Sequence, residues 1–203
     1  MPHNSLTDAA KMQEAMRLKF TYRYSKRLKG EQESVAAHSW SMILVADYLL
    51  AKLERHAPGK YILDRAKIYS LIAYHDLIEA ETGDEDVDPS NQENHKNKHT
   101  QEDKVFQSFL QKLPQEIQSI YENRHLEYEA RETLESKFVK IVDCIEAEFF
   151  CYGKGYLFKN WSKDFHESIR YKHFSAFPEL KYIIQDMIHH FDETYYQKQI
   201  PLC

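Results

Sequence analysis

Apolar residues recur at helical spacing along most of the chain, and polar or Gly/Pro-containing breaks separate the runs. Residues 33–55 form the clearest run: Glu33 and Ser34 can open a helix, and the break at residues 57–59 follows it. Another helix is predicted to start near residues 63–64 and to continue until Gly83 breaks it. The predicted helices span about residues 7–20, 33–55, 63–82, 93–104, 105–113, 116–129, 132–150, 163–175 and 178–197.

The alternation typical of β-strands is not recognisable in the sequence, and no internal repeat or linker stands out. Glycine and proline are scarce, at 5 and 6 residues, while helix-favouring residues are common. A chain of 203 residues with 42% apolar residues is long enough to bury a substantial core in one domain. We therefore expect an all-α protein with about seven to nine helices in a single domain.

Charge and cysteine content limit the possible binding partners and the cellular compartment of the protein. The formal net charge of -5 argues against a general nucleic-acid or membrane-surface binder. The three cysteines, Cys144, Cys151 and Cys203, lack zinc-type spacing, and their odd number favours a reducing compartment over a disulfide framework. The sequence has neither a signal-peptide pattern nor an apolar run long enough to span a membrane, so a cytoplasmic location is expected.

Polar residues interrupt three apolar helical faces. His38 lies on the apolar stripe of residues 33–55, and His75 follows Ile72 on the buried face of the next helix, beside Asp76. Asp143 stands in the middle of the segment from residue 138 to 150, which is apolar nearly all round. Each of these residues could be a buried polar group with hydrogen-bond partners of its own, independent of the others. However, two imidazoles and two carboxylates together suit a divalent metal and leave room for water and substrate oxygen.

The segment after His75 carries further acidic residues. Glu79 is expected one helical turn after His75, on the same face, where it can transfer a proton. Asp84 follows Gly83 in a loop.

Two further groups of residues could bind ligands. Residues 17–29 hold six basic side chains, which form either a solvated helix face or an anion site. His95 and His99 are four residues apart and could share a metal, although their polar context offers no third ligand.

The order and spacing of these residues resemble the HD-domain metal-dependent phosphohydrolases, in particular the group of bacterial 5'-deoxynucleotidases and HD domain-containing protein 2. The resemblance extends over about residues 20–150. It rests on E-S-V-A-A-H at residues 33–38, H-D-L-I-E-A-E-T-G-D at residues 75–84 and V-K-I-V-D at residues 139–143. It implies an HD domain with a core at about residues 20–150, on which C-terminal helices at residues 160–198 pack.

The resemblance also implies roles for individual residues. The implied ligands of one divalent metal are His38, His75, Asp76 and Asp143. Mn²⁺ or Co²⁺ is favoured, while Fe²⁺, Ni²⁺, Zn²⁺ and Mg²⁺ are also compatible with these ligands. Glu79 matches the acidic residue that handles the attacking water, and Asp84 matches a further acid of the substrate site.

The implied substrate-binding residues are Arg23, which matches a phosphate-binding arginine, and Tyr24 beside it. Tyr24 stands where the nucleotidases often carry a tryptophan that discriminates the sugar. The implied reaction is hydrolysis of a (deoxy)nucleoside 5'-monophosphate to nucleoside and phosphate. Alternatives are hydrolysis of another nucleotide, such as an alarmone, and a non-catalytic regulatory module. The resemblance and the aromatic C-terminal helices favour a homodimer.

Overall fold

The computed structural model describes residues 5–24, 32–85, 102, 104–154 and 161–196, and most of them are helical, which confirms the all-α prediction. The elements are α1 Ser5–Met16, a 3₁₀ turn η1 Arg17–Phe20, β1 Tyr22–Arg23, β2 Glu33–Ser34, α2 Val35–His56, α3 Arg65–Tyr74, α4 Glu79–Thr82, a helix over residues 104–112, α6 Gln115–Ala130, α7 Leu134–Cys151, α8 Lys163–Arg170, 3₁₀ turns η4 Tyr171–Ala176 and η5 Pro178–Leu180, α9 Lys181–Phe191 and a π-helical turn η6 Asp192–Tyr196.

Side-chain caps set the starts of the three helices that carry the candidate residues. The Ser34 hydroxyl accepts a hydrogen bond from the amide of Ala37, and the Asp64 carboxylate accepts one from Lys67, so α2 and α3 begin where the sequence predicts. Thr133 caps α7 in the same way. These caps satisfy amides that a helix end leaves without intrahelical partners.

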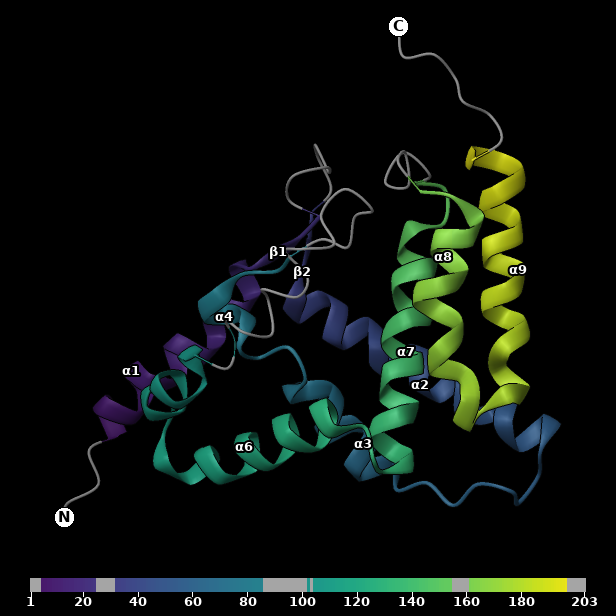
Figure 1. The fold of residues 1–203 in the computed structure, drawn as a ribbon. Helices are drawn as coiled ribbons and strands as arrows, with labels where there is room; N and C mark the ends of the chain where they lie inside the picture. The colour runs from purple at the N-terminus through teal and green to yellow at the C-terminus, as the bar shows by residue number, and fades with distance from the viewer. Residues whose placement is uncertain (1–4, 25–31, 86–101, 103, 155–160, 197–203) are drawn as a thin grey trace, which may run out of the picture.

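Figure 1 shows two groups of helices that meet at an angle: α1, α4 and α6 on one side, and α7, α8 and α9 on the other, with α2 crossing behind α7. The larger core cluster joins α2, α3 and α7 to the C-terminal segment. Phe138 of α7 and Phe177 before η5 are both fully buried, and their ring centroids lie 5.6 Å apart. Among the described helices, none is both long and apolar enough to cross a membrane.

The predicted His-Asp stretch lies where two apolar cores meet. Leu71 and Ile72 belong to the larger core cluster. Leu77 and Ile78 belong to a second cluster, which also contains residues of η1 and α6. Because apolar anchors hold the chain on both sides, His75 and Asp76 between them are fixed at the junction of the two helix groups.

Three local predictions need correction. The first helix ends at Met16 and tightens into η1 rather than running on to Phe20. A two-stranded antiparallel sheet pairs Tyr22 with Ser34 and Arg23 with Glu33. Strands of two residues are too short to produce a recognisable alternating pattern. The helix and the histidine pair predicted at residues 93–104 lie mostly outside the described residues.

The third correction concerns residues 75–78, which were predicted to continue the helix of residues 63–82. Instead, α3 ends at Tyr74, turns follow, and α4 begins at Glu79. The amide of Glu79 donates to the carbonyl of Asp76 at 3.0 Å, three residues back rather than four. Neighbouring residues of a regular α-helix face different directions. The tightened turns let His75 and Asp76 face one point.

Candidate metal centre

The two candidate histidines reach the junction from separate helices. His38 lies in the first turns of α2 and His75 directly follows α3, and both are buried. Their ring centroids are 5.6 Å apart with planes tilted by 56°. The Nε2 atom of His75 lies 2.9 Å from Oδ2 of Asp76, and Nε2 of His38 lies 4.0 Å from the same oxygen. Donor atoms of these three residues lie within 4.8 Å of one another.

Asp143 approaches this group from the middle of α7. Its Oδ1 lies 3.4 Å from Nε2 of His38. Its other oxygen accepts hydrogen bonds from Lys140 Nζ at 2.6 Å and from the Tyr128 hydroxyl at 3.2 Å. Burial alone would favour the neutral acid, but Lys140, His38 and His75 outweigh burial and hold the pKa of Asp143 well below its ordinary value. The carboxylate is therefore charged at neutral pH and can bind a cation.

The four residues fit a divalent ion. The Nε2 atoms of His38 and His75 are buried and have no hydrogen-bond partner among the described residues. Buried polar atoms are normally satisfied, and here both nitrogens face carboxylate oxygens. Two ligands bound at right angles to one ion at ~2.1 Å would lie ~3 Å apart. Two of the distances here, 2.9 and 3.4 Å, are close to that separation.

The two carboxylates beside His38 favour the cationic form of its ring, in which both nitrogens are protonated. Burial and Arg23 lower its pKa, but the close carboxylates of Asp143 and Glu146 outweigh them and raise the pKa of His38 to about 9. Metal ligation requires a neutral imidazole nitrogen, so a bound cation would displace the proton that faces Asp143.

Glu79 is held beside the His-Asp pair by its backbone. Its amide donates to the carbonyl of Asp76, and its own carbonyl accepts a hydrogen bond from the Thr21 hydroxyl at 3.4 Å. The residue is only 2% exposed, although it is a carboxylic acid. Glutamates are almost never fully buried unless they are paired. The backbone of Glu79 thus follows Asp76 through a tightened turn, and the catalytic role of its side chain stays a prediction.

Arg23 and Tyr24 lie toward the Nδ1 atom of His38, whereas Asp76 and Asp143 lie near its Nε2 atom. The Nη1 atom of Arg23 lies 2.9 Å from Oε2 of Glu33 and 3.3 Å from Oε2 of Glu146. Glu146 in turn contacts Nδ1 of His38. Burial lowers the pKa of Arg23, but Tyr24 and the carboxylates of Glu146, Glu33 and Asp84 outweigh burial and raise that pKa well above its ordinary value, so the group stays charged. Asp84 therefore lies in the electrostatic surroundings of Arg23.

Tyr24 has an unusual backbone conformation for a residue other than glycine, with a φ of 54°. Its ring stacks on Phe150 with centroids 5.5 Å apart, and the Arg23 guanidinium lies 5.2 Å from its centroid. Left-handed conformations of bulky residues are costly and often occur at functional sites. The sequence predicts Tyr24 as a site residue, but only the structure reveals this geometry.

Two buried acids, Glu33 and Glu146, were missed as candidates. They form a second group of possible metal ligands with His38. Arg23 pairs with both carboxylates, so its guanidinium already neutralises the charge that a metal ion would neutralise in that group. Glu146 stands three residues after Asp143 within the apolar segment, and this helical spacing could have identified it. The contact of Arg23 with Glu33 depends on the short strand pair, which the sequence did not reveal.

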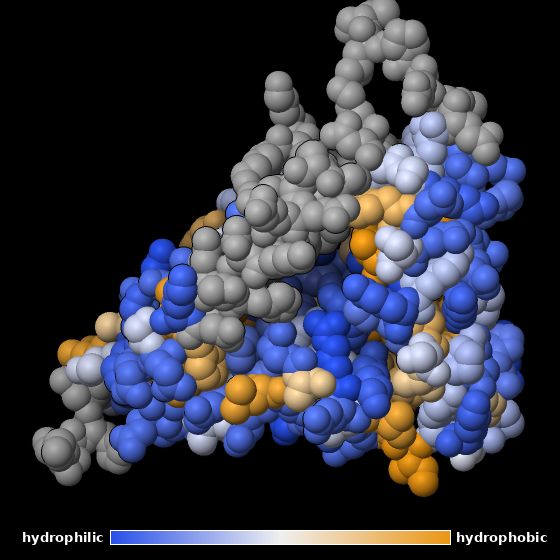
Figure 2. Space-filling view, in the orientation of Figure 1, coloured by the Kyte–Doolittle hydropathy of each residue, from blue (hydrophilic) through white to orange (hydrophobic). Residues whose placement is uncertain are grey.

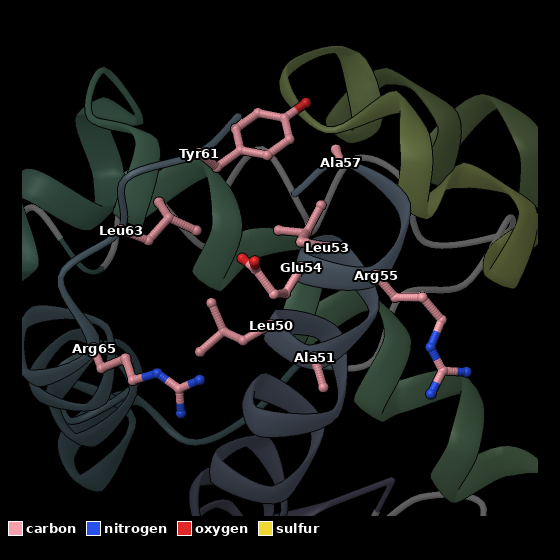
Figure 3. A pocket seen from close by; sticks show the side chains of 9 residues that line it. All are labelled: Leu50, Ala51, Leu53, Glu54, Arg55, Ala57, Tyr61, Leu63 and Arg65. Atoms are coloured by element: carbon pink, nitrogen blue, oxygen red, sulfur yellow. The ribbon is translucent and has the colours of Figure 1, made fainter. Parts of the chain in front are cut away.

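The space-filling view shows a hollow with a visibly hydrophilic lining in the angle between α6 and α7 (Figure 2). A separate groove of about 500 Å³ lies beside the C-terminal half of α2 (Figure 3). Its lining includes Leu50, Glu54, Tyr61 and Arg65, and contains none of the candidate residues. The groove offers neither converging histidines nor a buried acid, so the candidate chemistry belongs to the His-Asp cluster.

Comparison with known proteins identifies the family and the fold of the chain. The chain belongs to the HD domain family, whose model matches residues 15–180. The predicted resemblance to HD-domain proteins is thereby confirmed. Among curated proteins, the 5'-deoxynucleotidase HDDC2 of Bos taurus is 29% identical over 114 residues, which are 56% of this chain and 50% of that protein. The chain thus matches only about half the length of this relative.

Solved structures share the fold. An HD-domain phosphohydrolase from Listeria innocua is 22% identical, with a TM-score of 0.67 and 90% of each chain covered. A protein from Pyrococcus horikoshii OT3 is 27% identical, with a TM-score of 0.64 and coverage of 88% of this chain and 97% of that one.

Proposed function

We propose that this protein is a metal-dependent phosphohydrolase that converts (deoxy)nucleoside 5'-monophosphates to nucleoside and phosphate. The observation that carries the proposal is the convergence of two buried imidazole nitrogens, which lack hydrogen-bond partners among the described residues, with Asp76 and Asp143. Membership of the HD domain family supports the metal chemistry. The partial match to a bovine 5'-deoxynucleotidase supports the substrate class.

In this proposal His38, His75, Asp76 and Asp143 hold one divalent ion, with Mn²⁺ or Co²⁺ favoured. When bound, such an ion supplies an acidified water and a Lewis acid for the phosphoryl oxygen. The residues of the chain provide positioning and proton transfer. Lys140 and Tyr128 hold one oxygen of Asp143 and thereby direct the other oxygen toward His38.

Glu79 is the proposed proton acceptor for the attacking water and the donor to the leaving oxygen. Its nearly complete burial removes competing bulk water, and its backbone bond to Asp76 holds it one turn from the ligands. A carboxylate within hydrogen-bond reach of its substrate proton contributes about 10²–10⁴-fold to such a reaction. Asp84, beyond Gly83, is proposed as a further acid that contacts the substrate.

Arg23 and Tyr24 are the proposed contacts for phosphate and sugar. The charge of Arg23 is secured by its buried acidic neighbours, and a guanidinium offers a planar set of donors that matches phosphate oxygens. The stacked ring of Tyr24 lies directly beside it. A hydrolysable phosphate would then lie between Arg23 and the metal ligands, with the nucleoside toward Tyr24.

We also propose that the chain forms a homodimer through an apolar stripe on α2. Trp40, Leu44 and Tyr48 are four residues apart, and they are 63%, 54% and 41% exposed. Phe149 of α7 extends the stripe, since its ring centroid lies 6.1 Å from that of Tyr48. Contiguous exposed apolar side chains of this kind are typical of protein interfaces.

A phosphate-release screen tests the enzymatic proposal. Ribo- and deoxyribonucleoside monophosphates, nucleoside di- and triphosphates and a guanosine tetraphosphate would each be incubated with chelated protein, with and without Mn²⁺ or Co²⁺. Metal-dependent release from monophosphates alone is the expected result. Release only from the tetraphosphate would assign the site to alarmone hydrolysis. No release from any substrate, together with tight nucleotide binding, would indicate a regulatory module.

A further inference from the structure

One helix contacts both ring nitrogens of His38. Asp143 and Glu146 are three residues apart on α7, so they share a face. Oδ1 of Asp143 lies 3.4 Å from Nε2 of His38, and Oε2 of Glu146 lies 2.5 Å from Nδ1. The His38 side chain has no exposed surface, and that of Glu146 is only 4% exposed. The imidazole is therefore held between two carboxylates with different surroundings.

A buried carboxylate needs compensation for its lost hydration. For Glu146 this comes from Arg23, whose Nη1 lies 3.3 Å from the same Oε2 atom that contacts His38. Glu33 accepts from Arg23 at 2.9 Å and fixes the guanidinium from the facing strand. Side-chain contacts thus run without a break from Glu33 and Arg23 of the β1–β2 pair, through Glu146, to His38 in the first turns of α2.

We propose that Glu146 is a positioning residue for His38, and that Arg23 and Glu33 hold it in place. A carboxylate that accepts the Nδ1 proton fixes the tautomer and leaves Nε2 to face Asp143 and Asp76. The inference deepens the proposed function, because it concerns the same metal site. It assigns a role to two acids that the family resemblance did not identify, and it gives Arg23 a second role beside phosphate binding.

The test measures metal affinity rather than turnover. Mn²⁺ binding to the chelated full chain would be measured by calorimetry, and the visible spectrum of the Co²⁺ form would report ligand geometry. Glu146→Gln is expected to weaken Mn²⁺ binding by about 10–100-fold, the usual effect of losing such an outer partner. The Co²⁺ spectrum should change as well. Glu146→Asp keeps the charge but shortens the reach toward His38, and should also weaken binding.

Glu148→Gln is the matched control, because Glu148 is also a buried glutamate of α7. Its Oε1 accepts from His166 at 2.8 Å and from Arg170 at 2.7 Å, away from His38. This variant should lower the melting temperature and leave the Mn²⁺ affinity and the Co²⁺ spectrum as in the wild type. A merely structural role for Glu146 would give that same pattern.

The results separate the two proposals. If the wild type binds Mn²⁺ and either folded Glu146 variant binds it equally well, the positioning role is overturned while the proposed function stands. The aspartate variant serves this purpose if the glutamine variant does not fold. If the wild type binds neither Mn²⁺ nor Co²⁺, the proposed metal site fails and the inference fails with it.

Discussion

His75 donates a hydrogen bond through Nδ1 to the backbone carbonyl of Ile72, at 2.8 Å. A carbonyl oxygen can only accept, so Nδ1 must carry the proton in the neutral ring. The Nε2 lone pair of His75 is thereby directed toward Asp76. A backbone carbonyl at the end of α3 thus orients His75, whereas two side chains of α7, Asp143 and Glu146, orient His38.

The first prediction concerns the metal. Chelation should abolish the proposed phosphatase activity, and added Mn²⁺ or Co²⁺ should restore it. His75→Asn should lose metal because the amide cannot keep both the Ile72 contact and the ligand position. Metal content measured by elemental analysis after dialysis checks this. His56→Asn, at an exposed histidine of α2, should retain wild-type metal content. Equal metal content in both variants would remove His75 from the ligand set.

The second prediction concerns proton transfer. Glu79→Gln should lower kcat by about 10²–10⁴-fold while metal content stays unchanged, since the amide cannot accept a proton. Steady-state phosphate release and elemental analysis measure the two quantities. The control is Glu81→Gln, two residues on, at an exposed residue whose carboxylate pairs with Lys112. Loss of metal from Glu79→Gln would instead make Glu79 a ligand.

Much of this arrangement could be predicted from the sequence. Capping residues and apolar spacing locate α2, α3 and α7, and polar residues on apolar faces identify the four proposed ligands. The break at residues 75–78 could not be predicted, because no glycine or proline marks it. It follows from packing, since Leu71 and Leu77 are anchored in different core clusters. Local propensity contains no information about such distant contacts.

The third prediction tests the core beneath the site. Phe138→Ala should reduce the free energy of unfolding by about 3–5 kcal/mol, because a fully buried ring is lost from its contact with Phe177. Chemical denaturation monitored by circular dichroism gives this quantity. Leu126→Ala, at a site that is 55% exposed, should change it by less than about 0.5 kcal/mol. Similar effects for the two variants would contradict the assigned packing of α7.

The fourth prediction concerns the apolar stripe on α2. Leu44→Glu places a charge in the centre of the proposed interface, and a symmetric contact would bring two such charges close together. Light scattering should show a dimer for the wild type and a monomer for this variant, with the helical content retained. Ile120→Glu, at an exposed apolar residue of α6, should remain dimeric. A monomeric wild type would contradict the homodimer outright.

The fifth prediction concerns pH and His173 in η4. Burial lowers the pKa of His173 to about 3, and the positive charges of Lys140, Arg131, Lys172 and Arg170 add to the effect. The unfolded chain takes up this proton near the ordinary histidine pKa of about 6.5. Between the two values the unfolded state binds more protons, so folding stability must fall as the pH falls.

His173→Gln removes this proton uptake from the unfolded state. The melting temperature of the variant should therefore fall less than that of the wild type between about pH 7 and about pH 5. Scanning calorimetry at several pH values measures the difference, and the acidic groups common to both proteins cancel in the comparison. His189→Gln, at an exposed histidine, should follow the wild-type curve. Parallel curves for His173→Gln and the wild type would show that His173 titrates normally in the folded chain.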